Sequence, residues 1–227
     1  MLRKLEVSKL EAIIADYSKL YTCAVSDAID ELGLEPGFID AEIRPMWPGA
    51  RILGFAGTMK MIPSEEPLDR NIIARLVKFM RKTPKFPIMC VDMSNQMIAA
   101  GLGQSTSRLL KKLGFRGALV DGPVRDMAQV IDLKFPIFAR GIICSSIRSR
   151  MIIDMDSVMQ PIKCGERMIN PGDLIFGDIN GVVIILANHI ENVLEKAKEI
   201  ISTDKWWFEQ LESGRDPTDI EKEKPLP

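Results

Sequence analysis

Short apolar runs alternate with amphipathic segments through the middle of the chain, and this alternation constrains the fold more than any other feature. Apolar runs typical of buried strands are followed by helical patterns, and these by further apolar runs. A strand, a helix and a second strand at this spacing are typical of crossover units, which align their strands in parallel. The pattern predicts an α/β fold with a largely parallel central sheet, with strands at residues 51–62, 87–92, 117–120 and 136–139 and helices at residues 71–82, 107–113 and from Val124.

The two ends of the chain add helices and a hairpin to this sheet. Apolar residues recur at helical spacing from Val7 to Tyr17, and Ser26-Asp27 forms a good N-cap for a second helix that Gly33 can end. Turn residues separate two short apolar runs in the last third of the chain. The predicted elements at the ends are helices at residues 7–17 and from about 26 to 33, a hairpin at residues 174–186 and a helix at residues 190–201.

One domain accounts for nearly the whole chain. Its 227 residues, of which 46% are hydrophobic, are enough to bury a sizeable core, and no internal repeat or low-complexity linker divides them. The charges and prolines of the last residues are typical of an extended segment. We predict a single domain over residues 1–212, with N-terminal helices at about 7–33, and an extended or flexible C-terminal arm over residues 213–227.

The balance of charge argues against two classes of partner. Thirty basic and 31 acidic residues leave a formal charge of −1, so no global field attracts nucleic acid or an acidic membrane. The charged N-terminal segment does not resemble a signal peptide, and no apolar run is long enough to span a bilayer. We therefore expect a cytoplasmic protein with no nucleic-acid partner and no membrane partner.

A single histidine and four scattered cysteines restrict the available chemistry. His189 is far in sequence from any serine or cysteine in an elbow-like setting, which argues against Ser-His or Cys-His nucleophilic catalysis. The cysteines form no CxxC pair, so neither a zinc knot nor a dithiol redox site is indicated. Chemistry must depend on carboxylates, arginine, backbone amides or a metal ion.

A glycine-rich stretch precedes one of the predicted helices. In Gly101-Leu-Gly-Gln-Ser-Thr106 the glycines let the backbone approach a ligand, and the free amides of the following helix start attract anions. A small carboxylate or phosphate would fit there. The same glycines also fit a simple tight turn, so the stretch alone leaves both interpretations open.

A second stretch, GALVDGPVRDM at residues 117–127, places charged residues beyond the end of a buried strand. We expect a turn at Asp121-Gly122 and then a helix with Pro123 in its first turn. Arg125 and Asp126 then project beyond the carboxyl end of a parallel strand, where open α/β sheets bind ligands. The helix face expected to pack on the sheet consists of Val124, Met127, Ala128 and Ile131.

Arg125 and Asp126 allow two interpretations. An arginine can hold a carboxylate or keto oxygen, and an adjacent aspartate can hold a hard divalent cation that keeps most of its waters. An acidic residue at a helix start with an arginine nearby is also a common surface ion pair of little consequence. The residues alone leave these interpretations even.

The segment GLGQSTSRLLKKLGFRGALVDGPVRDMAQVIDLKFPIFARG, from Gly101 to Gly141, resembles the central signature of the RraA-like family. VSDAIDELG from Val25 and PGDLIFGDINGVVII from Pro171 are similar to further segments of that family. The family contains regulator of ribonuclease activity A and the class II pyruvate aldolases, which cleave 4-hydroxy-4-methyl-2-oxoglutarate and 4-carboxy-4-hydroxy-2-oxoadipate. The resemblance implies a ββα "swivelling" domain, a three-layer sandwich assembled as a homotrimer or homohexamer with active sites between subunits.

The resemblance also implies roles for particular residues. The family takes an acidic residue from the C-terminal helix of a neighbouring subunit, and Glu199 and Asp204 are both candidates. The two stretches that the residues themselves indicate are the ones that the family uses. Its substrate-binding loop falls on Gly103, Gln104, Ser105 and Thr106, its pyruvyl-binding arginine on Arg125 and its metal-binding aspartate on Asp126.

The implied activity is that of a metal-dependent lyase acting on a small 2-oxo acid. It would cleave a 4-hydroxy-2-oxo diacid to pyruvate by a retro-aldol reaction, or decarboxylate oxaloacetate. Arg125 and the loop amides would hold the substrate, while Mg²⁺ or Mn²⁺ on Asp126 neutralises the developing enolate. Asp121 is either a general base or, more in keeping with its position, a turn residue bonded to its own backbone.

Gln104 departs from the family pattern, because the aldolases usually carry an acidic residue directly after the loop glycine. Glutamine can hydrogen-bond a bound water but cannot take a proton or balance the charge of a cation. It adds weight to an alternative, a non-enzymatic regulator that binds an RNA-degrading endonuclease. The aromatic cluster Trp206-Trp207-Phe208 fits either a core or a subunit interface, and aromatic enrichment at interfaces favours the second.

Overall fold

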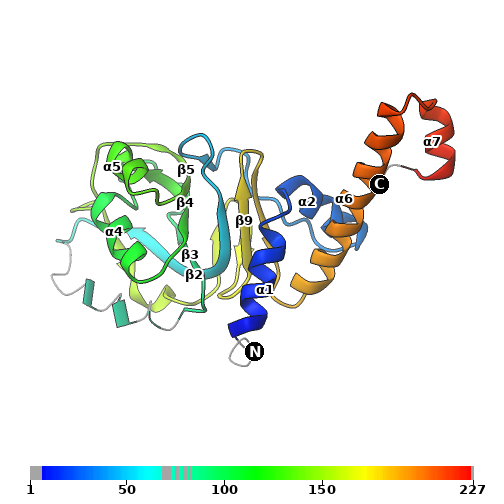
Figure 1. The fold of residues 1–227 in the computed structure, drawn as a ribbon. Coiled ribbons are helices and arrows are strands. Elements are labelled where there is room, and N and C mark those ends of the chain that lie inside the picture. The colour runs from blue at the N-terminus through cyan, green and yellow to red at the C-terminus, as the bar shows by residue number, and fades with distance from the viewer. Residues whose placement is uncertain (1–6, 68–72, 75–76, 79–80, 82, 226–227) are drawn as a thin grey trace.

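The computed structural model describes residues 7–67, 73–74, 77–78, 81 and 83–225. Within this part of the chain, eight strands form the central sheet in the order β1-β5-β4-β3-β2-β9-β10, with β6 paired to β2 (Figure 1). The helix predicted at residues 71–82 lies largely outside the described residues. The strands are β1 (Arg44–Pro45), β2 (Ile52–Pro63), β3 (Pro87–Asp92), β4 (Gly117–Val124), β5 (Ile137–Ile142), β6 (Met151–Asp154), β9 (Leu174–Asp178) and β10 (Gly181–Ile185).

Strands β2, β3, β4 and β5 run parallel, and the remaining pairs in the sheet are antiparallel. Every residue of β3 and β4 is buried, as expected of strands covered on both faces. The β9–β10 hairpin extends the sheet on the other side of β2, and a smaller hairpin, β7 (Ile162–Cys164) and β8 (Arg167–Ile169), covers part of the sheet. The predicted α/β fold with a largely parallel central sheet is confirmed.

Helices cover the sheet from two sides (Figure 1). Helices α4 (Gln104–Lys112) and α5 (Met127–Asp132) pack on one side, over a core that includes Val91, Val120 and Ile137. Helices α1 (Val7–Tyr17), α2 (Thr22–Glu31) and α6 (Ile190–Glu212) lie on the other side, over a second core. None of the helices within the described residues is both long and apolar enough to cross a membrane.

Helix α2 begins at Thr22, four residues before the predicted Ser26-Asp27 cap. Its start is capped by a residue distant in sequence: the Asp178 carboxylate at the end of β9 accepts hydrogen bonds from the Thr22 amide at 2.9 Å and its hydroxyl at 2.7 Å. A local sequence pattern could not predict this cap, because it depends on tertiary structure. Gly33 follows the helix with a φ of +64°, as predicted for its end.

Strand β4 continues to Val124, so the turn predicted at Asp121-Gly122 and the helix predicted from Val124 are wrong. The parallel register with β5 shifts between Val120 and Pro123, which absorbs the proline without ending the strand. The short helix α5 starts only at Met127. Its buried residue is Val130, whereas Ala128 and Ile131, expected on the packed face, are exposed.

The C-terminal region is more helical than its composition indicates. Helix α6 runs to Glu212, and a further helix, α7 (Pro217–Glu223), forms in the segment expected to be extended. Ile220 of α7 is fully buried, and the Trp207 indole donates a hydrogen bond to the Lys224 carbonyl at 2.8 Å. Figure 1 shows that the end of α6 and all of α7 project from the body of the molecule. Trp207 is thus buried within this projection, while Phe208 is exposed.

Candidate active site

The segment after β3 leaves the sheet and returns beside the last residues of β4. Leu102 forms a parallel bridge with Val124, and the Gly101 amide donates to the Pro123 carbonyl at 2.9 Å. The Arg125 amide in turn donates to the Leu102 carbonyl at 3.0 Å. This added strand fixes the start of α4 against the residues that link β4 to α5. The glycine-rich stretch and the stretch that contains Arg125 and Asp126 therefore meet beyond the carboxyl end of β4.

Gly103 is the point of closest approach between the two stretches. A Cβ atom at this position would lie 2.7 Å from Asp126 Oδ2 and 2.9 Å from Arg125 Cγ. Side chains essentially never approach this closely, so only glycine fits without displacement of its neighbours. The backbone conformation at Gly103, with a φ of −148°, is open to any residue. Packing, and not backbone conformation, is therefore the reason that a glycine is required here.

Arg125 and Asp126 occupy the link between β4 and α5. Their side chains are 38% and 37% exposed, and Arg125 Nε lies 3.6 Å from Asp126 Oδ2. They are therefore close to one another but open to a ligand, in contrast to a closed bidentate pair. Asp126 has φ +57° and ψ +39°, in the left-handed region that residues with a Cβ rarely adopt. Such outliers persist where the surrounding structure holds them, and they gather at functional sites.

Asp126 also caps helix α4. Its Oδ2 accepts a hydrogen bond from the Gln104 amide at 3.0 Å. The first bond within the helix is from the Ser107 amide to the Gly103 carbonyl, and the amides of Ser105 and Thr106 have no acceptor among the residues that the structure describes. Two free amides and the Arg125 guanidinium thus form a set of donors suited to a carboxylate or keto oxygen.

A divalent cation of the hard type fits the donors present. Asp126 Oδ2 is occupied by the Gln104 amide, whereas Oδ1 has no hydrogen-bond partner within the described residues. No cluster of three histidine, cysteine, aspartate or glutamate side chains occurs among those residues. One carboxylate oxygen in a half-exposed position suits Mg²⁺ or Mn²⁺, which retain several waters, and does not suit zinc, which needs three or four protein ligands.

Gln104, the residue that departs from the family pattern, lies in the first turn of α4 and is half-buried. Its amide contacts Asp126, and its side chain makes no hydrogen bond in the described part of the chain. The side-chain amide is therefore free to contact a bound water or substrate. It brings no negative charge to the site, and among the described residues Asp126 is the carboxylate paired with Arg125.

Asp121 cannot serve as the general base that its position in the sequence allowed. The residue is buried, its Oδ1 accepts from Arg140 Nε, and its Oδ2 accepts from the Gly165 amide at 3.0 Å. It is also not a turn residue bonded to its own backbone, as the sequence favoured, because β4 passes through it. Both carboxylate oxygens are committed to structural hydrogen bonds.

Arg140 is the residue that the sequence analysis did not single out. Its side chain is 3% exposed and forms ion pairs with Asp121, with Asp40 at 2.8 Å and with Glu42 at 2.9 Å. The cluster joins β4 and β5 to the segment before β1. The hydrogen bond from the Glu42 backbone amide, and then that from Arg140, lower the pKa of Asp40. The one available signal was its place in FARG, at the end of the segment that resembles the family, and the structure has it within β5, the strand that neighbours β4.

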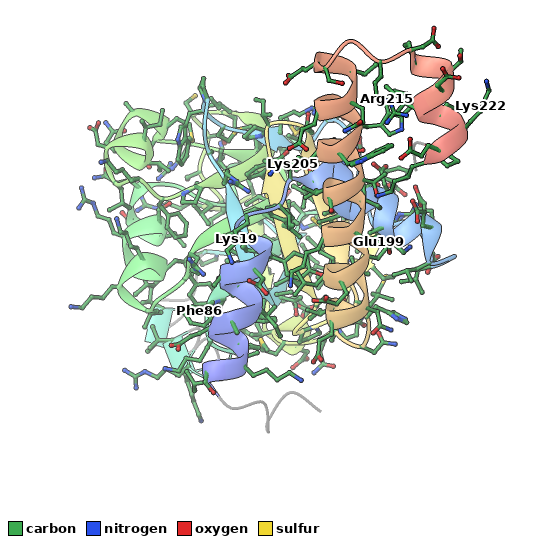
Figure 2. The ribbon with its side chains drawn as sticks, turned by 45° about the vertical axis from the view of Figure 1, so that its right-hand side comes forward. Lys19, Phe86, Glu199, Lys205, Arg215 and Lys222 are labelled. Carbon is green, nitrogen blue, oxygen red and sulfur yellow. The ribbon has the colours of Figure 1, made fainter. Side chains whose placement is uncertain are left out.

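Glu199 and Asp204 lie on α6, on the opposite side of the sheet from α4 and α5 (Figures 1 and 2). Glu199 is paired with Lys196 at 2.9 Å, which lowers its pKa, and Asp204 accepts a hydrogen bond from Tyr21 at 3.0 Å. Neither reaches the site of its own chain. His189 directly precedes α6 on that same side.

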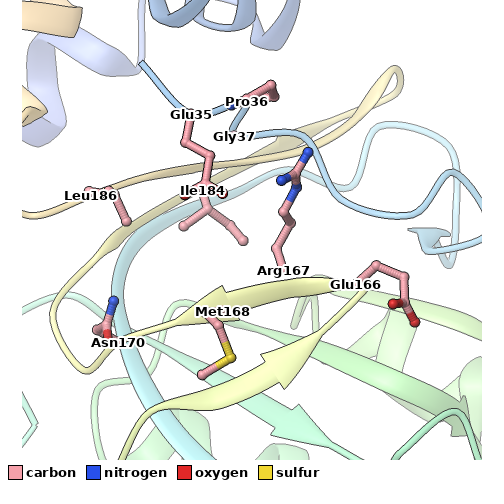
Figure 3. A pocket seen from close by; sticks show the side chains of 9 residues that line it. All are labelled: Glu35, Pro36, Gly37, Glu166, Arg167, Met168, Asn170, Ile184 and Leu186. Atoms are coloured by element: carbon pink, nitrogen blue, oxygen red, sulfur yellow. The ribbon is translucent and has the colours of Figure 1, made fainter.

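One hollow lies away from these residues. It measures about 300 Å³ and is lined by residues that include Glu35, Glu166, Arg167, Met168 and Ile184 (Figure 3). Figure 3 shows Arg167 and the two glutamates around its rim, so charges of both signs are present. It contains none of the residues predicted for the site.

Comparison with known proteins gives a consistent result. The model of the family RraA-like, described as Aldolase/RraA, matches residues 22–184. A protein of Halalkalibacterium halodurans named "Putative 4-hydroxy-4-methyl-2-oxoglutarate aldolase" is 30% identical over 192 residues, which cover 85% of each chain. Protein DlpA of Legionella pneumophila is 28% identical over 190 residues, which are 84% of this chain but 30% of DlpA, so the chain spans less than a third of that relative.

Solved structures show the same fold. RraAS2 of Streptomyces coelicolor, described as an unusual member of the RNase ES inhibitor RraA protein family, superposes with a TM-score of 0.75. The match covers 86% of this chain and 96% of RraAS2 at 19% sequence identity. At that identity the likeness shows the fold alone.

Proposed function

Because the chain belongs to the RraA-like (Aldolase/RraA) family, we propose that it is a divalent-metal-dependent lyase that releases pyruvate from a small 2-oxo acid. The substrate class is a 4-hydroxy-2-oxo diacid such as 4-hydroxy-4-methyl-2-oxoglutarate, cleaved by a retro-aldol reaction, with decarboxylation of oxaloacetate as a related activity. The observation that carries the proposal is the meeting of Arg125, Asp126 and the free amides of α4 around Gly103. The relative named as an aldolase supports the choice of reaction.

Substrate binding depends on the donors of the site. The Arg125 guanidinium and the amides of Ser105 and Thr106 hold the C1 carboxylate and the C2 keto oxygen of the 2-oxo acid. When the bond between C3 and C4 lies parallel to the π orbitals of the held carbonyl group, its electrons can flow toward the keto oxygen as the bond breaks. Donors aimed at that oxygen stabilise the negatively charged enolate more than the neutral ketone. They therefore lower the barrier to cleavage of the bond.

Asp126 would hold Mg²⁺ or Mn²⁺ through Oδ1. The bound cation supplies Lewis-acid stabilisation of the negative charge that develops on the substrate. Asp126 itself keeps its position through the Gln104 amide bond and its left-handed backbone. The C4 hydroxyl proton passes to water, since Asp121 is committed to Arg140 and Gly165. The enolate of pyruvate then takes a proton at C3 from water.

A coupled assay of pyruvate release tests the proposal. The wild-type protein is assayed with 4-hydroxy-4-methyl-2-oxoglutarate and with oxaloacetate, with Mg²⁺ or Mn²⁺ and after chelation, against blanks containing the metal without protein. Arg125→Gln and Asp126→Asn should each lower kcat/KM by about 100-fold or more, the usual effect of removing one stabilising group. Arg148→Gln, which alters an exposed arginine, is the control. Absence of metal-dependent pyruvate above the blanks from either substrate would refute the enzyme proposal.

The alternative function is a non-enzymatic regulator that binds an RNA-degrading endonuclease. Gln104 favours it, because the site lacks the acidic residue usual in the aldolases. Inhibition of endonuclease cleavage by this chain, together with no metal-dependent turnover, would support the regulator. If the lyase proposal is right, Gln104→Glu should tighten Mg²⁺ binding measured by calorimetry, because a second carboxylate offsets the charge of the cation.

We further propose that the protein assembles as a homotrimer or homohexamer. Large apolar side chains are exposed on several elements, among them Ile142, Ile179 and Phe208, as expected of surfaces covered by other subunits. Assembly would let Glu199 or Asp204 of a neighbouring subunit approach the Arg125 site. Sedimentation velocity would show a single species of three or six subunits, and a monomer at micromolar concentration would contradict the assembly.

A further inference from the structure

Two arginines line a hollow at the end of the sheet opposite the candidate active site. The hollow measures about 260 Å³, and Arg51 and Arg116 directly precede β2 and β4, so both lie at the amino ends of parallel strands. Arg125 and Asp126 follow the carboxyl end of β4, whose 8 residues span about 25 Å. The hollow is therefore separate from the candidate active site. It is lined by Ser18, Arg51, Leu53, Arg116 and Phe176.

Tight packing next to the two arginines brings them to one place. A Cβ atom at Gly117 would lie 2.6 Å from Ile52 Cγ2, so the backbone after Arg116 lies directly against the residue after Arg51. Each guanidinium is held over an aromatic ring. Arg51 Cζ lies 5.6 Å from the centroid of Phe176, and Arg116 Cζ lies 5.3 Å from that of Phe86. Both distances fall in the range of cation–π contacts.

No carboxylate in the described part of the chain forms an ion pair with either arginine. Arg51 donates one hydrogen bond, from Nη2 to the Leu20 carbonyl at 2.9 Å. The neighbouring acid at the end of α1, Asp16, is occupied by Lys19 and Lys198, each about 3 Å away. Those two lysines lower the pKa of Asp16, so it stays ionised and paired with them. The two guanidinium groups thus share one hollow without a counter-ion from the residues that the structure describes.

The hollow of Figure 3, in contrast, is lined by acidic residues as well as by an arginine. There, Arg167 shares the hollow with Glu35 and Glu166, and its Nε donates to the Phe38 carbonyl. Charges of both signs line that hollow, whereas the hollow of Arg51 and Arg116 has cations alone on an apolar floor of Leu53 and Phe176. Two like charges in one concave site attract an anion, and planar guanidinium groups match carboxylate and phosphate oxygens.

We propose that the hollow of Arg51 and Arg116 is a second ligand site, which binds a small organic anion with an apolar body. The anionic head, a carboxylate or a phosphate monoester, contacts the two guanidinium groups, and the apolar body contacts Leu53 and Phe176. The volume lies just below the range of about 300–1,000 Å³ usual for drug-sized ligands, so the ligand has the size of one substituted ring or a short chain.

Isothermal titration calorimetry with three probes tests the proposal. Benzoate and phenyl phosphate present the two anionic heads on the same ring, and benzamide is the neutral counterpart. We expect one or both anions to bind the wild-type protein at millimolar concentration or below, and benzamide to bind at least about tenfold more weakly. Arg116→Gln should weaken anion binding at least about tenfold, since each guanidinium contributes a charge-assisted hydrogen bond.

Matched variants separate this site from its alternatives. Arg44→Gln is the control. Like Arg51, Arg44 is an exposed arginine that donates to a backbone carbonyl, in this case that of Asn180. It lines none of the described hollows. Arg125→Gln should bind the anions as the wild type does. Arg116 makes no side-chain hydrogen bond with the described residues, so its variant should keep the fold, which circular dichroism verifies.

Four results would overturn the proposal. These are no binding of either anion by the wild type, unchanged binding by Arg116→Gln, loss of binding in Arg125→Gln alone, and equal weakening by Arg44→Gln. The third would place the anion in the candidate active site, and the fourth would mean non-specific attraction. Arg51→Gln, if folded, should repeat the effect of Arg116→Gln.

Discussion

Gly103 is the residue on which the geometry of the candidate site most depends. We predict that Gly103→Ala lowers kcat/KM for pyruvate release by at least about 100-fold, because its Cβ would displace Asp126 and Arg125 from their positions. Circular dichroism and the Tm should change little, since the strain is released by movement of exposed side chains. Gly141→Ala is the control, because its Cβ would meet only Met97 Cε, at an ordinary 3.5 Å. Equal activity of the two variants would contradict the prediction.

The closeness of the candidate site residues was predictable from the sequence, but their conformation was not. Gly103, Arg125 and Asp126 come after predicted parallel strands. The carboxyl ends of such strands lie at the same edge of the sheet, so these residues could be placed together. The left-handed backbone of Asp126 and the continuation of β4 through Pro123 could not be foreseen. Asp-Gly-Pro is a strong local turn signal, and here pairing with residues distant in sequence prevails over it.

Helix α2 carries a carboxylate whose pH dependence is predictable. Burial, and then the charges of Asp30, Asp204 and Glu31, raise the pKa of Asp27 in the folded protein. Ionisation of Asp27 therefore lowers the stability of the folded state. This loss is absent at pH values below the unfolded pKa of about 3.9 and complete at pH values above the raised folded pKa. Asp27→Asn should stabilise the protein at pH 7 by up to about 1 kcal/mol, the usual limit for exposed charges, and should not do so at pH 3.5.

Urea unfolding at the two pH values measures this effect. Glu212→Gln, which neutralises an exposed acid at the end of α6, serves as the control and should change stability little at either pH. Stabilisation by Asp27→Asn that is equal at both pH values would mean that its cause is not the charge.

Helix α7 depends on one apolar contact for its position. Ile220 is the buried residue of α7 and packs in the same projection as Trp207. Ile220→Ala should cost about 2–5 kcal/mol of the local stability of this projection, and should speed tryptic cleavage at Arg215 and Lys222 without lowering the Tm of the body. Glu221→Gln on the exposed face should leave the cleavage rate unchanged. A lower global Tm would show that α7 belongs to the main cooperative unit.

At the level of elements, strong patterns were predicted well and boundaries were not. The bounds of α1 and of β3 were predicted correctly, because each has a clear apolar period or run between turn residues. The start of α2 and the end of α6 were missed. The start of α2 was missed because its cap comes from the distant residue Asp178. The end of α6 was missed because the helix continues beyond the body of the domain, where apolar residues no longer indicate a buried face.

At the scale of the whole molecule, Arg140 links parts of the chain that are far apart in sequence. Its buried guanidinium balances Asp121, Asp40 and Glu42, and Asp121 in turn accepts the Gly165 amide beside β7. Arg140→Met should lower the free energy of unfolding by about 3–5 kcal/mol, because it leaves the buried carboxylate of Asp121 without its cation.

Chemical denaturation compared with Arg148→Met, a change at an exposed arginine, measures this loss. A destabilisation of less than about 1 kcal/mol would mean that the cluster behaves as a surface ion pair. The fold itself was predictable at this scale, since alternation of strands and helices leaves few topologies. The Arg140 cluster was not, because its members are spread over residues 40–165 and no local pattern joins them.

The cap of α2 has a consequence for the order in which the protein forms. The Thr22–Asp178 bonds span 156 residues, and the bond from the Tyr17 hydroxyl to the Ile190 carbonyl spans 173. During synthesis the N-terminal helices leave the ribosome first, yet the groups that secure them emerge last. Contacts of such length are slow to close. We therefore expect those two helices to dock late in folding, after the residues around Asp178 and Ile190 are in place.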